Sequence, residues 1–175
     1  EIDVQWVHFP LHPETPAEGR SLEELFAGRG IDIKASYDRM KGLMDEEGLP
    51  YNRRSHTYNS RPAQELGKWA DTKGSGDAFH DAMFRAYFVD GKNIAEIDAL
   101  IDIALGVGLD AAEAREVLTR RSFKEQVAAD WQRSRDYGIT GVPTFVAAGQ
   151  AAVGAQPYES LEKLVLAQGA GKRGA

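Results

Sequence analysis

The chain of 175 residues contains no cysteine. It therefore has no disulfide framework, no thiolate nucleophile and no thiolate ligand for a metal ion. It also lacks a long apolar run, since no stretch approaches the roughly 20 residues that cross a bilayer. Basic residues are outnumbered, 21 against 27 acidic ones, and the net charge is −6. Because phosphate backbones are bound by clustered cations, neither a nucleic acid nor a membrane is expected as a partner.

Sequence patterns that predict strands occur only near the two ends of the chain. Ile2, Val4 and Trp6 alternate with other residues and predict a first strand of about six residues. Near the other end, "PTFVAA" and "AAVG" flank a tight turn at Gly149-Gln150, which predicts a hairpin. "AQPYESLEKLVLAQG" predicts a closing helix, and residues 170–175 a disordered tail. The three strands are expected to form one small sheet.

The stretch between these ends, residues 21–138, has a helical pattern throughout most of its length. Capping-box spacings, a Ser, Asn or Asp followed three positions later by Glu, predict helix starts. Such spacings begin at Ser21, Asn93, Asp110 and Ser122. Pro62 is predicted to lie near the start of a further helix. The polar stretch "YNRRSH" is interpreted as a solvated loop.

Several stretches resemble one family: "WVHFPLHPETPAEG", "NSRPAQELGKWA", "MFRAYFVDGKNI", "ITGVPTFV" and "VGAQPYESLEKL". They are similar to the DsbA-like thioredoxin-fold family, especially its FrnE-like branch of thiol-disulfide oxidoreductases, over residues 4–166. The resemblance implies an α/β, thioredoxin-like fold with a large all-helical insertion. Residues 1–20 and 139–169 would form the partial thioredoxin-like domain, and residues 21–138 the insertion. It implies no cofactor and a cytoplasmic location.

In that family, a strand and a helix carrying Cys-x-x-Cys precede the strand that resembles residues 2–7. The resemblance therefore places about 25–30 further residues, with this motif, upstream of residue 1. The complete protein is expected to be an oxidoreductase, and the cysteine-free chain alone to be inactive. The first strand would lack its central partner here. A second copy of the chain could replace that partner, so a homodimer stays open.

The turn Val142-Pro143 is the candidate site within the chain. By resemblance it is a cis-proline loop that faces the upstream thiols. Pro143 has no N–H that could pair wrongly with a substrate. The backbone N–H and C=O of Val142 would pair with an extended substrate as in strand addition. Gly141 and Thr140 would complete the docking segment. The substrate would be a thiol or disulfide of a protein or small molecule, glutathione included.

Two histidines near the first strand are considered as further candidates for the site. His8 follows the strand and could tune the upstream thiolate, although a histidine at such a place is more often a strand-end residue bonded to the backbone. His12 lies four positions later, but Pro10 between them excludes a shared helical face. No metal site is therefore expected.

Two other functions stay open beside the oxidoreductase. One is a glutathione-dependent isomerase or transferase, resembling the kappa-class transferases and the 2-hydroxychromene-2-carboxylate isomerases. There a serine replaces the first cysteine, and the turn would hold the glutathione backbone. The other is a redox-dead module that retains only the peptide groove. The sequence motif "GAQPYE" favours the oxidoreductase.

Overall fold

The computed structural model describes residues 2–172, which divide into two compact units. The larger unit is His12–Val127, and the smaller one joins the residues up to Leu11 with those from Ala128 onward. The domain boundaries predicted from the sequence, at 20/21 and 138/139, differ from these. The first falls inside β1 (Arg20–Ser21) and the second after α7 (Lys124–Asp136). The tail predicted for residues 170–175 lies partly outside the described residues. No helix among residues 2–172 is long and apolar enough to cross a membrane.

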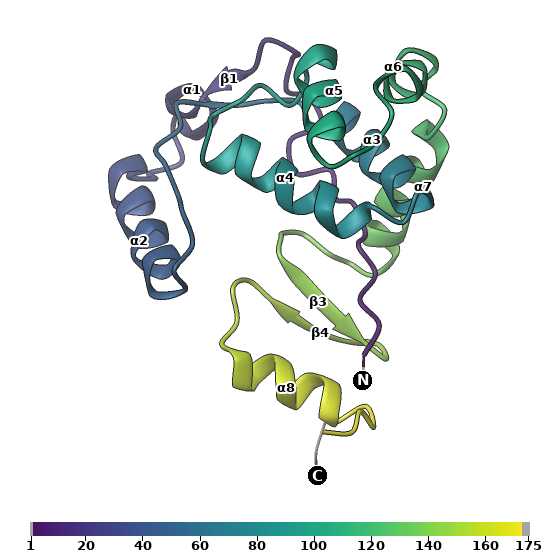
Figure 1. The fold of residues 1–175 in the computed structure, drawn as a ribbon. Helices are drawn as coiled ribbons and strands as arrows, with labels where there is room; N and C mark the ends of the chain where they lie inside the picture. The colour runs from purple at the N-terminus through teal and green to yellow at the C-terminus, as the bar shows by residue number, and fades with distance from the viewer. Residues whose placement is uncertain (1, 173–175) are drawn as a thin grey trace. The chain divides into compact units, whose positions relative to one another are not determined.

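The larger unit is built from helices around one core (Figure 1). Helix α3 packs against α4 and α6, and α5 packs against both α4 and α6. Leu66, Phe79 and Leu100 are fully buried at the centre of this core. Two short antiparallel strands, β1 and β2, pair Arg20 with Thr57 and Ser21 with His56. The elements are α1 (Leu22–Phe26), α2 (Ile33–Glu46), α3 (Arg61–Thr72), α4 (Gly76–Phe88), α5 (Ile97–Gly106), α6 (Ala111–Arg120), β1 (Arg20–Ser21), β2 (His56–Thr57) and the first residues of α7 (Lys124–Asp136).

Three predicted helix starts are confirmed. Ser21 forms a full capping box, in which Glu24 N–H donates to Ser21 Oγ and Ser21 N–H to Glu24 Oε2, both at 3.1 Å. Asp110 caps α6, since its carboxylate accepts from the backbone N–H of Glu113 at 2.8 Å. Pro62 lies in the first turn of α3, where a missing N–H costs no helical hydrogen bond.

The capping boxes predicted at Asn93 and Ser122 are wrong. Helix α5 begins at Ile97, because the Asn93 amide is used in a local turn instead. Its oxygen accepts from Ala95 N–H at 2.9 Å, and its nitrogen donates to the carbonyl of Ala17 at 3.0 Å. Helix α7 begins at Lys124, beyond Ser122. Spacing alone does not tell a helix cap from a side chain that closes a turn.

The smaller unit contains the hairpin β3 (Thr144–Ala147) and β4 (Gln150–Val153), followed by α8 (Tyr158–Leu166). Thr144 pairs with Val153 and Ala147 with Gln150. The turn residues are therefore Ala148 and Gly149, one position before the predicted turn, and both have positive φ (45° and 84°). Helix α8 packs on the hairpin (Figure 1).

The strand predicted for residues 2–7 is wrong in this structure, where that segment has no strand pairing. The exposed fractions of Ile2, Val4 and Trp6 are 57%, 67% and 43%. An alternating pattern becomes a strand only when its N–H and C=O groups find a ladder neighbour. The described residues consequently hold two two-stranded sheets rather than one sheet of three strands.

Candidate functional site

The turn Gly141-Val142-Pro143 leads directly into β3, and hydrogen bonds hold it from both sides. The hydroxyl of Thr144 donates to the carbonyl of Gly141 at 2.8 Å. The carbonyl of Pro143 accepts from Gly154 N–H at 2.8 Å, which extends the hairpin by one bond. The Val142-Pro143 peptide bond is cis. The turn is thus fixed to the end of the hairpin.

Val142 itself is the unpaired residue of this turn. Its exposed fraction is 49%, and its backbone N–H and C=O make no hydrogen bond within residues 2–172. A Cβ added to Gly141 would meet no atom within 4 Å, so the space beside the turn is open. Thr140 is also exposed. A free backbone donor and acceptor on an exposed residue next to a strand can pair with an extended backbone.

His8 is anchored to α7 through its backbone. Its N–H donates to the carboxylate of Asp130 at 3.0 Å, and its carbonyl accepts from Ser134 Oγ at 3.4 Å. The residue is half-buried. These bonds hold His8 beside α7, although residues 2–7 pair with no described strand. The role of the imidazole beside a thiolate stays a prediction.

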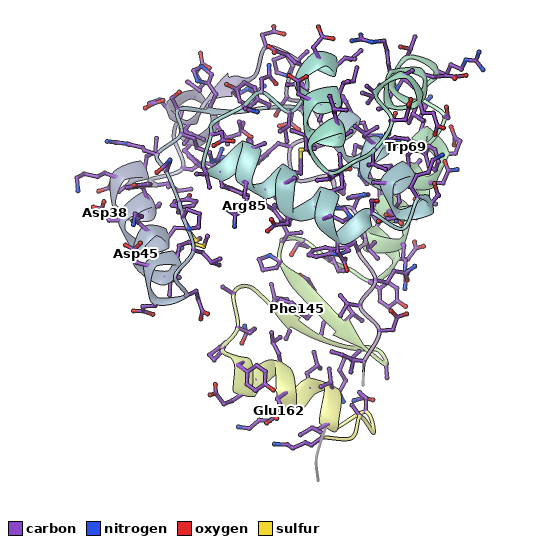
Figure 2. The ribbon with its side chains drawn as sticks, viewed as in Figure 1. Asp38, Asp45, Trp69, Arg85, Phe145 and Glu162 are labelled. Carbon is purple, nitrogen blue, oxygen red and sulfur yellow. The ribbon has the colours of Figure 1, made fainter. Side chains whose placement is uncertain are left out.

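Apolar side chains of the smaller unit remain exposed around the turn's hairpin. Phe145, labelled in Figure 2, is 39% exposed, Val146 is 42% and Val153 is 61%. Exposed apolar side chains gathered on one small sheet are typical of a surface that another element or a ligand covers. The two short runs around a tight turn predicted the hairpin, but not that both of its faces would stay accessible.

Within the part of the chain that the structure describes, no three His, Asp or Glu side chains are grouped closely enough to hold an ion.

Arg53 and Arg54, interpreted from the sequence as part of a solvated loop, instead line a pocket in the larger unit. Only tertiary contacts reveal this pocket, because its walls come from segments far apart in the chain.

One family model matches most of this chain, and several known proteins resemble it. Residues 1–166 match the family described as DSBA-like thioredoxin domain. The crystal structure of a probable DsbA oxidoreductase from Streptomyces coelicolor is 29% identical, covering 93% of this chain and 74% of that one, with a TM-score of 0.83. The uncharacterized protein YwbO of Bacillus subtilis (strain 168) is 26% identical over 166 residues, 94% of this chain and 82% of YwbO. The cytosolic disulfide reductase DsbM from Pseudomonas aeruginosa shares the fold at 20% identity and a TM-score of 0.53, covering 75% of this chain and 69% of DsbM.

Proposed function

Because the chain belongs to the family of DsbA-like thioredoxin domains, we propose that the complete protein is a thiol-disulfide oxidoreductase that docks its substrate on Val142. Membership confirms the resemblance and the α/β thioredoxin-like fold class with a helical insertion. The FrnE-like branch stays a prediction. The observation that carries the proposal is the exposed residue Val142, whose backbone N–H and C=O make no hydrogen bond within residues 2–172.

The chemistry would come from a Cys-x-x-Cys pair upstream of residue 1. A helix N-terminus lowers the pKa of the first cysteine, so that it is a thiolate at neutral pH. This thiolate attacks one sulfur of a substrate disulfide, and the other substrate sulfur leaves as a thiolate. The second cysteine then attacks the mixed disulfide, which releases the reduced substrate and leaves the cysteine pair oxidised. The reverse sequence oxidises a substrate dithiol.

The turn would supply orientation for this exchange. Val142 N–H donates to a substrate carbonyl and Val142 C=O accepts from a substrate N–H, as in the addition of a short strand. In-line attack requires the three sulfur atoms to align, so a substrate held by its backbone reacts faster. Pro143 has no N–H that could compete for the substrate carbonyl. Gly141 and Thr140 would extend the same docking segment.

The exposed apolar residues of the smaller unit also support the proposal that a further strand and helix cover them in the complete protein. Ile2, Val4 and Trp6 are all exposed, as are Phe145 and Val146. A preceding strand and helix would bury such side chains and give residues 2–7 a ladder partner. A second copy of the chain is the alternative occupant. The cytoplasmic location stays a prediction.

The coding sequence upstream of Glu1 and a turnover assay test the proposal together. The extended protein is expected to accelerate the reduction of insulin by dithiothreitol, whereas its first-cysteine-to-serine variant and the 175-residue chain stay at the uncatalysed rate. A serine in place of the first cysteine, with glutathione-dependent activity, would favour the isomerase or transferase. Peptide binding without either activity would favour the redox-dead module. Acceleration by the cysteine-free chain would contradict the proposal.

A further inference from the structure

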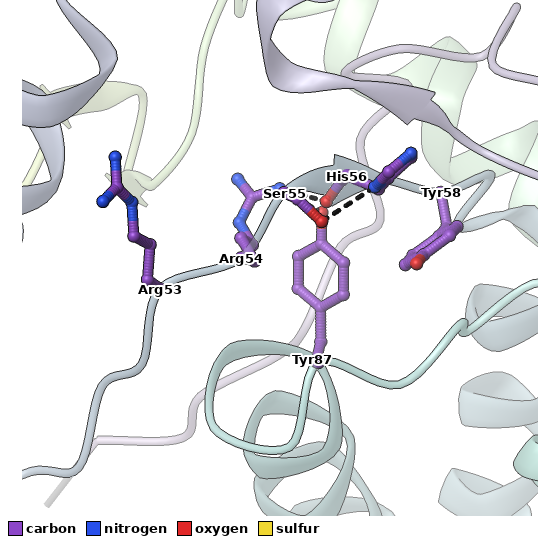
Figure 3. A pocket seen from close by; sticks show the side chains of 7 residues that line it. Arg53, Arg54, Ser55, His56, Tyr58 and Tyr87 are labelled. Atoms are coloured by element: carbon purple, nitrogen blue, oxygen red, sulfur yellow. Dashed lines mark hydrogen bonds between the residues drawn. The ribbon is translucent and has the colours of Figure 1, made fainter.

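The segment between α2 and α3 forms one wall of a small pocket in the larger unit (Figure 3). The pocket has a volume of about 120 Å³, and no carboxylate lines it. Its lining contains two guanidinium groups, an imidazole and three hydroxyl groups. They belong to Arg53, Arg54, Ser55, His56, Tyr58 and Tyr87.

Backbone hydrogen bonds hold this wall in place. Asn52 N–H donates to the carbonyl of Phe88 at 3.0 Å, and the Asn52 amide donates to the carbonyl of Val89 at 2.8 Å. Further along, the carbonyl of Ser55 accepts from Leu22 N–H at 2.8 Å. His56 belongs to β2, which pairs with β1. The polar groups are therefore displayed from a fixed backbone rather than from a free loop.

Arg54 is oriented by its neighbours but has no counter-ion among residues 2–172. Its Cζ lies 4.9 Å from the ring centroid of Tyr87 and 5.7 Å from that of Phe88, within cation–π range. Its Nη1 donates to the carbonyl of His56 at 3.0 Å and to the hydroxyl of Tyr87 at 2.7 Å. Within residues 2–172, Nη2 and the buried Nε make no hydrogen bond. The guanidinium is thus a positioned cation with unused donors.

Cationic side chains line the pocket although the whole protein is acidic. Neither Arg53 nor Arg54 forms an ion pair with a carboxylate in the described part of the chain. Burial is the main cause that lowers the pKa of His12. Arg29, Arg20 and Arg54 lower it further, while Glu14 opposes them. Several arginine charges therefore act on the same region of the unit.

We propose that this pocket binds phosphate or the phosphoryl group of a small molecule. The guanidinium groups and the hydroxyls of Ser55 and Tyr58 suit a tetrahedral oxyanion, whose oxygens accept from several directions. The Tyr87 hydroxyl already donates to Thr57 Oγ1 at 3.2 Å. At about 30 Å³ per water, the volume corresponds to about four waters, enough for one such group. Ser55 Oγ lies 2.9 Å from Nδ1 of His56, so these two residues can present a joined pair of polar groups to it.

A titration of the 175-residue chain with inorganic phosphate tests this site. At constant ionic strength and pH 7, two-dimensional NMR is expected to show saturable shifts confined to residues 53–58 and 87–91. Acetate, a planar carboxylate of lower charge, is expected to bind more weakly. Absence of saturable shifts, or acetate binding as tight as phosphate binding, would overturn the proposal.

Arginine variants separate specific binding from general charge. Arg53→Gln is expected to weaken phosphate binding about two- to fivefold, since its exposed charge is partly screened. Arg54→Gln is expected to weaken it about tenfold or more, because a charge-assisted donor is lost. Arg39→Gln removes the same charge from an exposed position on α2 that does not line the pocket. An equal loss in Arg39→Gln and Arg53→Gln would overturn the site, and Arg53→Gln keeps the test valid if Arg54→Gln fails to fold.

Discussion

Glu65 and Arg121, 56 positions apart in the chain, form an ion pair whose carboxylate is 1% exposed. Arg121 Nη2 donates to Glu65 Oε1 at 2.6 Å and Arg121 Nε to Oε2 at 3.2 Å. Arg61 Nε donates to the same carboxylate at 2.8 Å. The pair joins α3 to the residue that ends α6, and Arg121 has a left-handed backbone there. It fixes the connection between these helices in the larger unit.

Removing this carboxylate is expected to destabilise the larger unit strongly. Glu65→Ala leaves two arginines without their buried partner, a change that costs about 3–5 kcal/mol. Glu116, which pairs with Arg120 on the surface of α6, provides the control. Glu116→Ala is expected to cost about 1 kcal/mol or less. Urea unfolding followed by circular dichroism measures both, and equal losses would contradict a structural role for the buried pair.

Gly19 is expected to resist substitution because of its contact with Tyr58. Its φ is +90°, and an added Cβ would lie 2.5 Å from Cδ1 of Tyr58 and 2.8 Å from the carbonyl oxygen of Thr57. Gly28 has a φ of +73° but open space around its Cβ position. Gly28→Ala should therefore cost only the left-handed backbone penalty, about 1–2 kcal/mol. Gly19→Ala should add about 1–3 kcal/mol of overpacking. Thermal unfolding of both variants measures the difference. If Gly19→Ala loses no more stability than Gly28→Ala, the contact with Tyr58 does not limit substitution at Gly19.

The larger unit is expected to lose stability as the pH falls below about 6.5, the ordinary pKa of histidine. Burial lowers the pKa of His80, although Asp71, whose carboxylate lies 3.5 Å from Nε2, opposes the shift. Burial lowers the pKa of His12 in the same direction. The unfolded chain then binds more protons than the folded one. Stability is fully present above the unfolded pKa and is lost as the pH falls through the folded pKa.

Histidine variants identify the groups responsible for that dependence. The free energy of unfolding, measured between pH 7.5 and 5 (about the range in which histidine titrates), is expected to vary less with pH in His80→Gln than in the wild type. The double variant His12→Gln/His80→Gln should vary least. A slope unchanged in the double variant would assign the acid sensitivity to carboxylates instead.

Local chemistry explains the parts of the fold that the sequence predicted. The caps at Ser21 and Asp110 depend on side chains only three positions from the N–H that they accept from, and the β3–β4 hairpin on one short turn. The location of the Val142-Pro143 turn before a strand follows from the same short-range pattern. Such features need no knowledge of distant residues.

Features that depend on distant partners were not predictable in this way. Residues 2–7 have the alternation of a strand, yet pairing requires a neighbour that a local pattern cannot specify. The Glu65–Arg121 pair and the pocket wall at Arg54 likewise arise only after the helices have packed. The unpaired backbone groups of Val142 could not be predicted from its sequence neighbours, since pairing with a distant segment does not depend on them.

The most direct measurement of the central claim compares two glycine variants of the complete, thiol-active protein. At both Gly141 and Gly42 an added Cβ meets no atom within 4 Å, and neither glycine has a left-handed backbone. Gly141→Val places bulk beside the proposed docking residue, whereas Gly42→Val places it on α2. If two backbone hydrogen bonds of about 1 kcal/mol each are lost, kcat/KM for exchange with a peptide disulfide should fall about tenfold or more in Gly141→Val. The account predicts that fall with unchanged melting temperature and thiol pKa, and with wild-type kinetics in Gly42→Val. Unchanged exchange kinetics in Gly141→Val would contradict substrate docking at Val142.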